Sequence, residues 1–286
     1  KIPVDWQYFS TGPEMMQAFY RNELDAGYLG LTPAMIGIEK GVPIKCVAGG
    51  HIEGTIFCGS PHFHGIDQVS GGMMEVFSQF IGKTIGTPKQ GSIHSVILNY
   101  YLHKFNLHEK ITVLYYDDAE VIALDISKRK IDAGMGTPAL ATYAKCLGPS
   151  KILIPPNQLW PYNPSYGVFF HNEIIANNPE IVEAFLHAHI EAEETLRKHP
   201  QDAAKAIAHI FNIKDVLPEY FERVIRISPK YCALLDDPYI ESSMGLMREM
   251  VKLGYLKGEM DVNRVFYPDL IRKIHREPAH YNQNEK

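Results

Sequence analysis

The sequence predicts an α/β fold of two lobes, with parallel-rich sheets flanked by helices and a helical C-terminal region. β-type runs alternate with helical segments as far as about residue 154, and such alternation is typical of parallel sheets. In addition, one motif occurs twice, as Leu-Asp-Ala-Gly-Tyr-Leu-Gly-Leu-Thr-Pro-Ala at 24–34 and as Ile-Asp-Ala-Gly-Met-Gly-Thr-Pro-Ala at 131–139. Two copies indicate a pair of similar lobes, because a solenoid needs more repeats than two.

The composition is that of a globular protein with enough residues for two cores. The chain has 286 residues, of which 45% are hydrophobic and 21% are charged. Its net charge of −5 disfavours binding to nucleic acid, and it has no apolar run of the ~18 residues that span a membrane. The cysteines lack the close spacing of a zinc site, and we interpret Cys46 and Cys58 as small buried side chains.

The first lobe is predicted to begin with a strand at 4–9, followed by a helix at 13–22. After the first copy of the motif come two apolar runs, at 44–47 and 55–58, and we expect the second run to cross into the other lobe. Residues 59–72 contain several glycines and a proline, as surface loops do.

The second lobe is predicted from regular alternation, and the chain then becomes helical. We expect helices at 73–80, 92–105 and 119–129 and strands at 83–88 and 111–116. A proline-rich and aromatic segment at 155–166 leads to a return strand at 168–170. The predicted C-terminal helices cover 181–198, 202–211, 219–225, 238–253 and 262–274.

Comparison of the two copies predicts the division into lobes. Phe9 and Asp25 are 16 residues apart, as are Tyr116 and Asp132, so strand, helix and motif are equally spaced. A further strand and helix at 83–106 precede the second copy only, so we expect the first βα unit of lobe one to be absent. The expected boundaries are 1–56 and 169–286 for lobe one and 57–168 for lobe two, with a ligand cleft between them and hinges at 55–58 and 167–170.

Four helix starts are predicted to supply donors to the ligand. Thr32-Pro33 and Thr137-Pro138 each place a hydroxyl at an N-cap and proline at the first helical position. Ser10-Thr11-Gly12 and Gln90-Gly91-Ser92 provide two more starts, while Asp118 precedes the helix at 119. Unpaired N–H groups at a helix start attract anions, although ordinary capping would explain each start singly.

The arginines, aromatic residues and histidines limit the chemical classes of ligand. No arginine lies in these loops, so we expect a small oxyanion held by neutral donors or an uncharged polar ring. Trp160 and Tyr166 are the best candidates for an aromatic wall, with lobe packing as the alternative. His51 is a more credible ligand contact than His62 and His64, which lack further ligands at metal-binding spacing.

The predicted ligand contacts are Phe9, Ser10, Thr11, Gly12, Thr32, His51, Gln90, Gly91, Ser92, Asp118, Thr137, Trp160 and Tyr166. We expect no catalytic residue, no metal site and no cofactor.

The order of motifs resembles the solute-binding proteins of ABC importers for sulfonates, nitrate, taurine and thiamine-pyrimidine precursors. The matching stretches are Phe9-Ser10-Thr11-Gly12, Glu23-Leu24-Asp25-Ala26-Gly27, Gly82-Lys83-Thr84-Ile85-Gly86, Lys130-Ile131-Asp132-Ala133-Gly134 and Asn178-Pro179-Glu180-Ile181-Val182. The resemblance implies a type II periplasmic-binding-protein fold and a monomer that delivers a small ligand to a membrane permease. It also implies a periplasmic or extracytoplasmic location, with a lipid anchor at a removed N-terminus as one form of attachment.

Two other functions on the same fold stay open as alternatives. One is an enzyme of pyrimidine or thiamine-precursor metabolism, although the clustered cysteines of the iron-dependent relatives are missing here. The other is a ligand-sensing domain. Alkanesulfonate, taurine, nitrate-like anions and a hydroxymethylpyrimidine-type ring are the candidate ligands.

Overall fold

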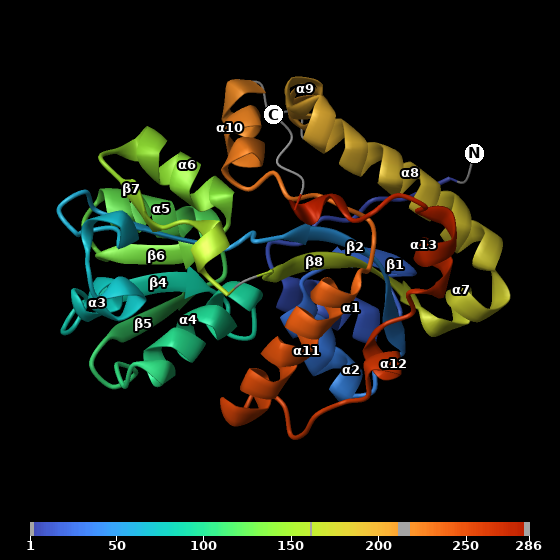
Figure 1. Cartoon of the computed structure of the whole chain (residues 1–286), viewed down its shortest axis with the longest axis horizontal. Helices are drawn as coiled ribbons and strands as arrows, with labels where there is room; N and C mark the ends of the chain where they lie inside the picture. The colour runs from blue at the N-terminus through green and yellow to red at the C-terminus, as the bar shows by residue number, and fades with distance from the viewer. Residues whose placement is uncertain (1–2, 161, 211–217, 283–286) are drawn as a thin grey trace. The chain divides into compact units, whose positions relative to one another are not determined.

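The computed structural model describes residues 3–160, 162–210 and 218–282, and the chain divides into two compact units (Figure 1). Unit 1 comprises residues 1–52 and 162–286, and unit 2 comprises residues 53–161. Relative to the expected lobes, strand β8 (Pro164–His171) falls wholly in unit 1, because it pairs with two strands of that unit along its length. Among the described residues, no helix combines the length and apolar character that crossing a membrane requires.

Unit 1 contains a three-stranded sheet in the order β1-β8-β2, with β1 at Ala26–Leu29 and β2 at Ile44–Ile52. β8 runs antiparallel to both neighbours, so β1 and β2 run in the same direction. Side chains alternate between the two faces of this sheet. A Cβ on Gly27 would meet Phe19 of α1, whereas Tyr28 contacts Phe185 of α8.

Helices cover both faces of the unit 1 sheet, and Figure 1 shows α1 and α2 on one face and α8 on the other. The first two are α1 (Gly12–Tyr20) and α2 (Leu31–Glu39). The others are α7 (Asn172–Asn177), α8 (Pro179–Lys198), α9 (Pro200–Ile210), α10 (Pro218–Ile227), α11 (Asp237–Lys252), α12 (Val262–Val265) and α13 (Asp269–Ile274).

Two predicted elements of unit 1 are corrected. Residues 4–9 form no strand, and Trp6 and Tyr8 are exposed, because this segment has no ladder partner among the described residues. The single helix expected at 262–274 is two short helices, since Pro268 lacks the N–H that a continuous helix would use.

Unit 2 is built on a five-stranded sheet in the order β5-β4-β6-β3-β7. Its strands are β3 (Ile56–Gly59), β4 (Thr84–Pro88), β5 (Thr112–Tyr116), β6 (Ala133–Gly136) and β7 (Lys151–Ile154). β4 is parallel to β5 and β6, and β3 alone runs the opposite way. The carboxyl ends of three neighbouring strands therefore meet at one edge of the sheet, where ligands bind in such folds.

Helices also cover both faces of the unit 2 sheet, with α5 and α6 on one side and α3 and α4 on the other (Figure 1). These helices are α3 (Gly72–Ser78), α4 (Ile93–Lys104), α5 (Ala119–Ser127) and α6 (Pro138–Leu147). Phe57, Phe77 and Phe80 form the aromatic part of the core, with ring centroids 5.1 and 5.2 Å apart in the two pairs that include Phe57. All three are fully buried.

Candidate functional site

The two copies of the motif begin their helices at equivalent positions, but only the second copy has its threonine at that position. The N-cap of α2 is Gly30 and that of α6 is Thr137, each five residues after the aspartate of its copy, Asp25 or Asp132. Thr32 lies in the first turn of α2 and is fully buried. The prediction that Thr32 caps a helix is therefore wrong, because the first copy has two additional residues between its glycine and its threonine.

Helices α1 and α2 start close together in unit 1. Thr11 is the N-cap of α1, and a Cβ on Gly12 would lie 2.7 Å from Cγ of Pro33 in the first turn of α2. A side chain at position 12 would push the two helix starts apart. Phe9 is half-buried and Ser10 is exposed. The structure therefore brings the predicted Ser10-Thr11-Gly12 start beside the N-terminus of α2.

Gln90-Gly91-Ser92 forms the start of α4 in unit 2, as predicted. Oγ of Ser92 accepts a hydrogen bond from the N–H of Ser95 at 3.3 Å, and Oγ of Ser95 accepts one from the N–H of Gly91 at 3.0 Å. Gly91 has φ of 88°, which favours glycine. Gln90 is exposed. Local capping thus occupies the Ser92 oxygen, and Gln90 is the accessible polar group of this loop.

The loop after β5 lies beside the loop after β4. Asp118 caps α5 by accepting a hydrogen bond from the N–H of Glu120 at 3.0 Å. A hydrogen bond between the two side chains lowers the pKa of Asp118 and raises that of Glu120. Nζ of Lys89 lies 3.1 Å from Oδ1 of Asp117, so the lysine charge is paired across the two loops. The half-buried Thr137, capping α6 after β6, completes this edge.

Four buried side chains carry polar atoms without a hydrogen-bond partner among the described residues. They are Oγ1 of Thr11, Oγ1 of Thr87, both amide atoms of Asn163, and Oε2 of Glu193. Buried polar atoms are nearly always paired, so each of these atoms suits a ligand or a water molecule. Only Thr11 was predicted. Thr87 was missed although it lies one residue before the end of β4, where strand-end side chains face the loops.

Trp160 and Tyr166, the predicted aromatic pair, lie in different units. Trp160 is in unit 2, where its backbone N–H donates to Oη of Tyr101 at 2.9 Å and its ring meets that of Tyr100 edge-on, with 4.8 Å between the ring centroids. Its φ of 44° is rare for a residue with a large side chain. Tyr166 lies in β8 of unit 1. Within the units, only Tyr166 joins the polar cluster described next.

His51 lies near Tyr166 but has a structural environment of its own. Its Nε2 is 2.8 Å from the carbonyl oxygen of Ser228 and its ring stacks on Tyr231 at 4.4 Å. Burial lowers the pKa of His51 to about 4, so the ring is neutral near pH 7. The ring centroids of His51 and Tyr166 are 6.0 Å apart. The structure thus unites these two predicted residues in unit 1.

A buried carboxyl group lies against Tyr166. Oη of Tyr166 donates to Oε1 of Glu193 at 3.2 Å, and Glu193 is only 1% exposed. Burial raises the pKa of Glu193 well above its usual value, and the guanidinium of Arg197 lowers it by less. Burial therefore favours the protonated, uncharged form of Glu193. Its second oxygen can accept a hydrogen bond from a ligand, or donate one when it carries the proton.

His189 links this carboxyl group to Tyr28 in β1. Nε2 of His189 lies 2.9 Å from the carbonyl oxygen of Gly49, which only accepts, so Nε2 carries the hydrogen. Nδ1 then accepts from Oη of Tyr28 at 3.3 Å. Burial lowers the pKa of His189 to about 4. We call Tyr28, Tyr166, His189 and Glu193 the carboxyl cluster.

The part of the carboxyl cluster that lies on α8 was not predicted from the sequence. Val182, Leu186, His189 and Glu193 are the buried residues of that helix, and they share one face. The sequence did contain a signal, because His189 and Glu193 lie four positions apart on an otherwise apolar face of the helix. Ionisable side chains are seldom fully buried, so two of them on a buried face indicate a functional site. The amphipathic pattern of 181–198 predicted the helix alone.

Two surface hollows of unit 1 are lined by residues other than these. One is on α10, lined by Glu219, Glu222 and Arg226, and the other lies beside α7 and α13, lined by Ile175, Tyr267 and Lys273. Neither contains a predicted contact. The candidate site is therefore defined by unpartnered polar groups, the carboxyl cluster and the helix starts.

Comparisons with known proteins agree with the resemblance seen in the motifs. The model of the NMT1-like family matches residues 1–212. A protein of Brucella abortus, named as a binding protein, is 24% identical over 276 residues, covering 94% of this chain and 82% of its own length.

Solved structures of transport proteins share the fold. The ligand-binding component of an ABC-type import system from Staphylococcus aureus, with zinc bound, has a TM-score of 0.76 at 17% identity, covering 94% of this chain and 87% of its own. The alkanesulfonate-binding protein SsuA from Xanthomonas axonopodis pv. citri has a TM-score of 0.73 at 15% identity, covering 92% and 86%. The periplasmic nitrate-binding protein NrtA from Synechocystis has a TM-score of 0.72 at 13% identity, covering 96% of this chain and 81% of its own. Because the family model matches most of its length, this chain belongs to the NMT1-like family.

Proposed function

We propose that this chain is the extracytoplasmic solute-binding component of an ABC importer, and that it binds one small ligand without transforming it. Family membership and the named functions of the relatives support this class. The observation that carries the proposal is the carboxyl cluster with its unpartnered Oε2 of Glu193, because a buried polar atom of this kind needs a partner.

Both units carry groups suited to a ligand in this proposal. Unit 1 contributes the carboxyl cluster and the paired starts of α1 and α2, and unit 2 contributes the sheet edge with Gln90, Asp118 and Thr137. Ligand binding favours a closed arrangement that a membrane permease recognises. The protein acts outside the cytoplasm, as a monomer that is either free or held by a lipid anchor.

The ligand we propose is a small uncharged ring with an amino group, such as an aminopyrimidine. A carboxyl group beside tyrosine rings pairs with an N–H edge and offers aromatic walls. A sulfonate or nitrate ion would instead gain most from N–H groups at helix starts. The position of Glu193 therefore favours the ring over the anions bound by the more distant relatives.

A thermal-shift screen tests this choice. The panel contains taurine, an alkanesulfonate, nitrate and 4-amino-5-hydroxymethyl-2-methylpyrimidine. Since a ligand that binds only the folded state raises its stability, we expect the pyrimidine to raise Tm and the anions to leave it unchanged. Glu193→Gln should weaken pyrimidine binding by about tenfold to a hundredfold, as expected for a hydrogen bond worth roughly 1.5–3 kcal/mol.

A matched control for this variant is Glu194→Gln, one residue along α8, whose carboxylate is exposed and pairs with Lys198. It should bind the pyrimidine as the unaltered chain does. A response to an anion, undiminished by Glu193→Gln, would replace the ring with an oxyanion ligand. Conversion of the pyrimidine by the purified chain would favour the enzyme alternative.

A further inference from the structure

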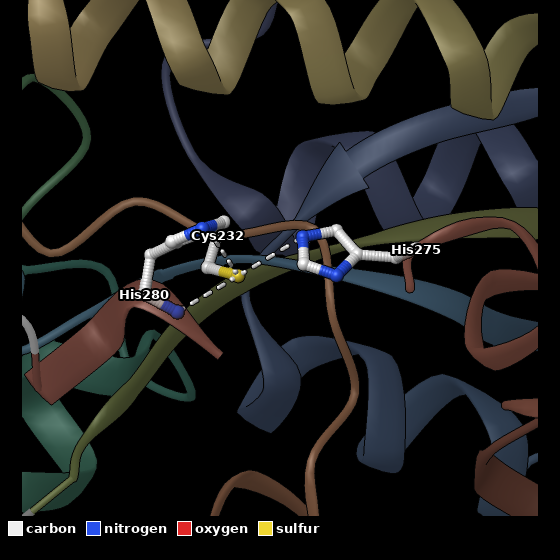
Figure 2. Close-up of side chains that lie close together, drawn as sticks. All are labelled: Cys232, His275 and His280. Carbon is white, nitrogen blue, oxygen red and sulfur yellow. Dashed lines mark hydrogen bonds between the residues drawn. The ribbon is translucent and has the colours of Figure 1, made fainter. Parts of the chain in front are cut away.

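Three potential metal ligands converge in unit 1, apart from the carboxyl cluster. Cys232, His275 and His280 are shown in Figure 2, and their nearest ligand atoms all lie within 4.8 Å of one another. Cys232 is fully buried, His275 is 8% exposed, and the His280 side chain is 9% exposed. The three residues come from two segments: the one that follows α10, and the one that follows α13.

The backbone holds both segments in place. The N–H of Cys232 donates to the carbonyl oxygen of Gly50 in β2 at 2.9 Å, which fixes the cysteine against the sheet. Oη of Tyr281 donates to the carbonyl oxygen of Leu234 at 3.1 Å, which fixes the segment that carries His280. The cluster is thus preorganised by contacts that do not involve its own side chains.

The two sulfur–nitrogen distances of the cluster match those around a tetrahedral ion. Sγ of Cys232 lies 3.7 Å from Nε2 of His275 and 3.5 Å from Nδ1 of His280 (Figure 2). With a Zn–S bond of about 2.3 Å and a Zn–N bond of about 2.05 Å, a tetrahedral site separates sulfur from nitrogen by roughly 3.6 Å. Both observed distances lie close to this value.

The outer hydrogen bonds direct both imidazoles toward the sulfur. Nδ1 of His275 lies 3.0 Å from the carbonyl oxygen of Glu277, and Nε2 of His280 lies 3.0 Å from Oε2 of Glu277. Both oxygens accept, so the hydrogens lie on these outer nitrogens and the inner nitrogens present lone pairs. Metal-binding histidines have this same arrangement, with a carbonyl or carboxylate behind each ring.

A thiol alone leaves this arrangement incomplete. Two imidazole lone pairs face Sγ of Cys232, yet a thiol has one hydrogen and can satisfy only one of them. A cation bound to the thiolate and both nitrogens satisfies all three ligands. The backbone N–H of His280 also donates to Sγ of Cys232 at 3.4 Å, and this helps to stabilise negative charge on the sulfur.

We propose that Cys232, His275 and His280 form a binding site for a zinc-type divalent ion, with water as the fourth ligand. Thiolate and imidazole are ligands that zinc prefers, whereas magnesium and calcium prefer oxygen. Cys232 loses its thiol proton to solvent when the ion binds. The ion links the segment after α13 to Cys232, whose N–H is hydrogen-bonded to β2, and it therefore stabilises unit 1. None of these three residues belongs to the carboxyl cluster.

Cobalt substitution tests the site in the unaltered chain. The purified protein, freed of metal with a chelator, is titrated with Co²⁺. We expect one equivalent to bind, with a thiolate-to-cobalt charge-transfer band and the intense visible bands of tetrahedral cobalt. Zn²⁺ should displace these bands and raise Tm. Absence of the charge-transfer band would overturn the proposal without any variant.

Three variants assign the ligands. Cys232→Ser and His280→Ala should abolish the cobalt bands and the zinc-dependent rise in Tm. Glu277→Gln changes a side chain that is 77% exposed, so it should fold normally and lose zinc affinity by about tenfold to a hundredfold, as outer-ligand changes do. The control is Cys146→Ser, which removes the exposed cysteine on α6 and should bind metal normally. Zinc binding that survives Cys232→Ser and His280→Ala unchanged would refute the assignment.

Discussion

Four buried side chains give this chain a distinctive dependence of stability on pH. Burial lowers the pKa of His51, His94 and His189 to about 4, whereas an unfolded chain would have histidine pKa values near 6.5. Below about pH 6.5 the unfolded state therefore binds protons that the folded state excludes, and stability falls with falling pH. Glu193 acts in the opposite sense, because its raised pKa keeps a proton in the folded state that the unfolded state loses above about pH 4.3.

These opposing effects predict a maximum of stability near neutral pH. Between pH 4.5 and 6.5, three histidines act against one glutamate, so the free energy of unfolding should rise by up to about 2.7 kcal/mol per pH unit. Above about pH 6.5 the three histidines no longer contribute, and Glu193 alone among these groups lowers stability with rising pH, by up to about 1.4 kcal/mol per pH unit, until the folded state also loses its proton. Urea unfolding at a series of pH values measures both slopes.

Glu193→Gln separates the two effects. Since glutamine does not titrate, the variant should show a steeper rise below neutral pH, of up to about 4.1 kcal/mol per pH unit, and should lose the decline above it. An unchanged decline in Glu193→Gln would show that another group causes it. The exposed Glu194→Gln serves as the control and should reproduce both slopes of the unaltered chain.

At the scale of single residues, His51 and Tyr166 were predicted as ligand contacts on separate grounds, and the structure places their rings 6.0 Å apart in unit 1. Their contact with a ligand stays a prediction. Thr32 was misassigned because a two-residue difference between the copies shifts the helix start to Gly30. Glu193 was missed because its burial depends on the sheet beneath α8, which periodicity alone does not reveal.

The elements of unit 2 depend on their caps, and α4 provides the clearest case. Ser92 accepts a hydrogen bond from the N–H of Ser95, which otherwise has no partner in the first turn. Ser92→Ala should lower the free energy of unfolding by about 1 kcal/mol, within the 0.5–2 kcal/mol usual for a lost N-cap. Denaturant unfolding measures this change.

Ser127→Ala is the control for the cap at Ser92. Its hydroxyl donates to the carbonyl oxygen of Leu124 at the exposed end of α5, so its loss should change stability by less than about 0.5 kcal/mol. Equal effects from both variants would contradict a capping role for Ser92.

Among the elements, helices and paired strands were predictable and unpaired segments were not. The apolar periodicity at 238–253 and 181–198 predicted α11 and α8 nearly to their ends. Residues 4–9 have β-type composition, but a strand also requires a neighbour, and the sheet of unit 1 gives them none. The break within 262–274 was readable from Pro268 and was overlooked.

For the whole molecule, the duplicated motif was the most productive signal. Each copy lies in one unit and leads from a strand into a helix start, at Gly30 in unit 1 and at Thr137 in unit 2. Fold class followed from this alternation, and the family and its relatives agree with it. The convergence of Cys232 with His275 and His280 was not predicted, because 43 residues separate the cysteine from the first histidine. The short spacing from His275 to His280 was the signal present in the sequence.

Isothermal titration with 4-amino-5-hydroxymethyl-2-methylpyrimidine, followed by mass analysis of the recovered compound, tests the central claim most directly. We expect saturable binding of one molecule per chain, weakened by Glu193→Gln, and recovery of the compound unchanged. Absence of saturable binding to the folded chain, or recovery of a converted product, would contradict it.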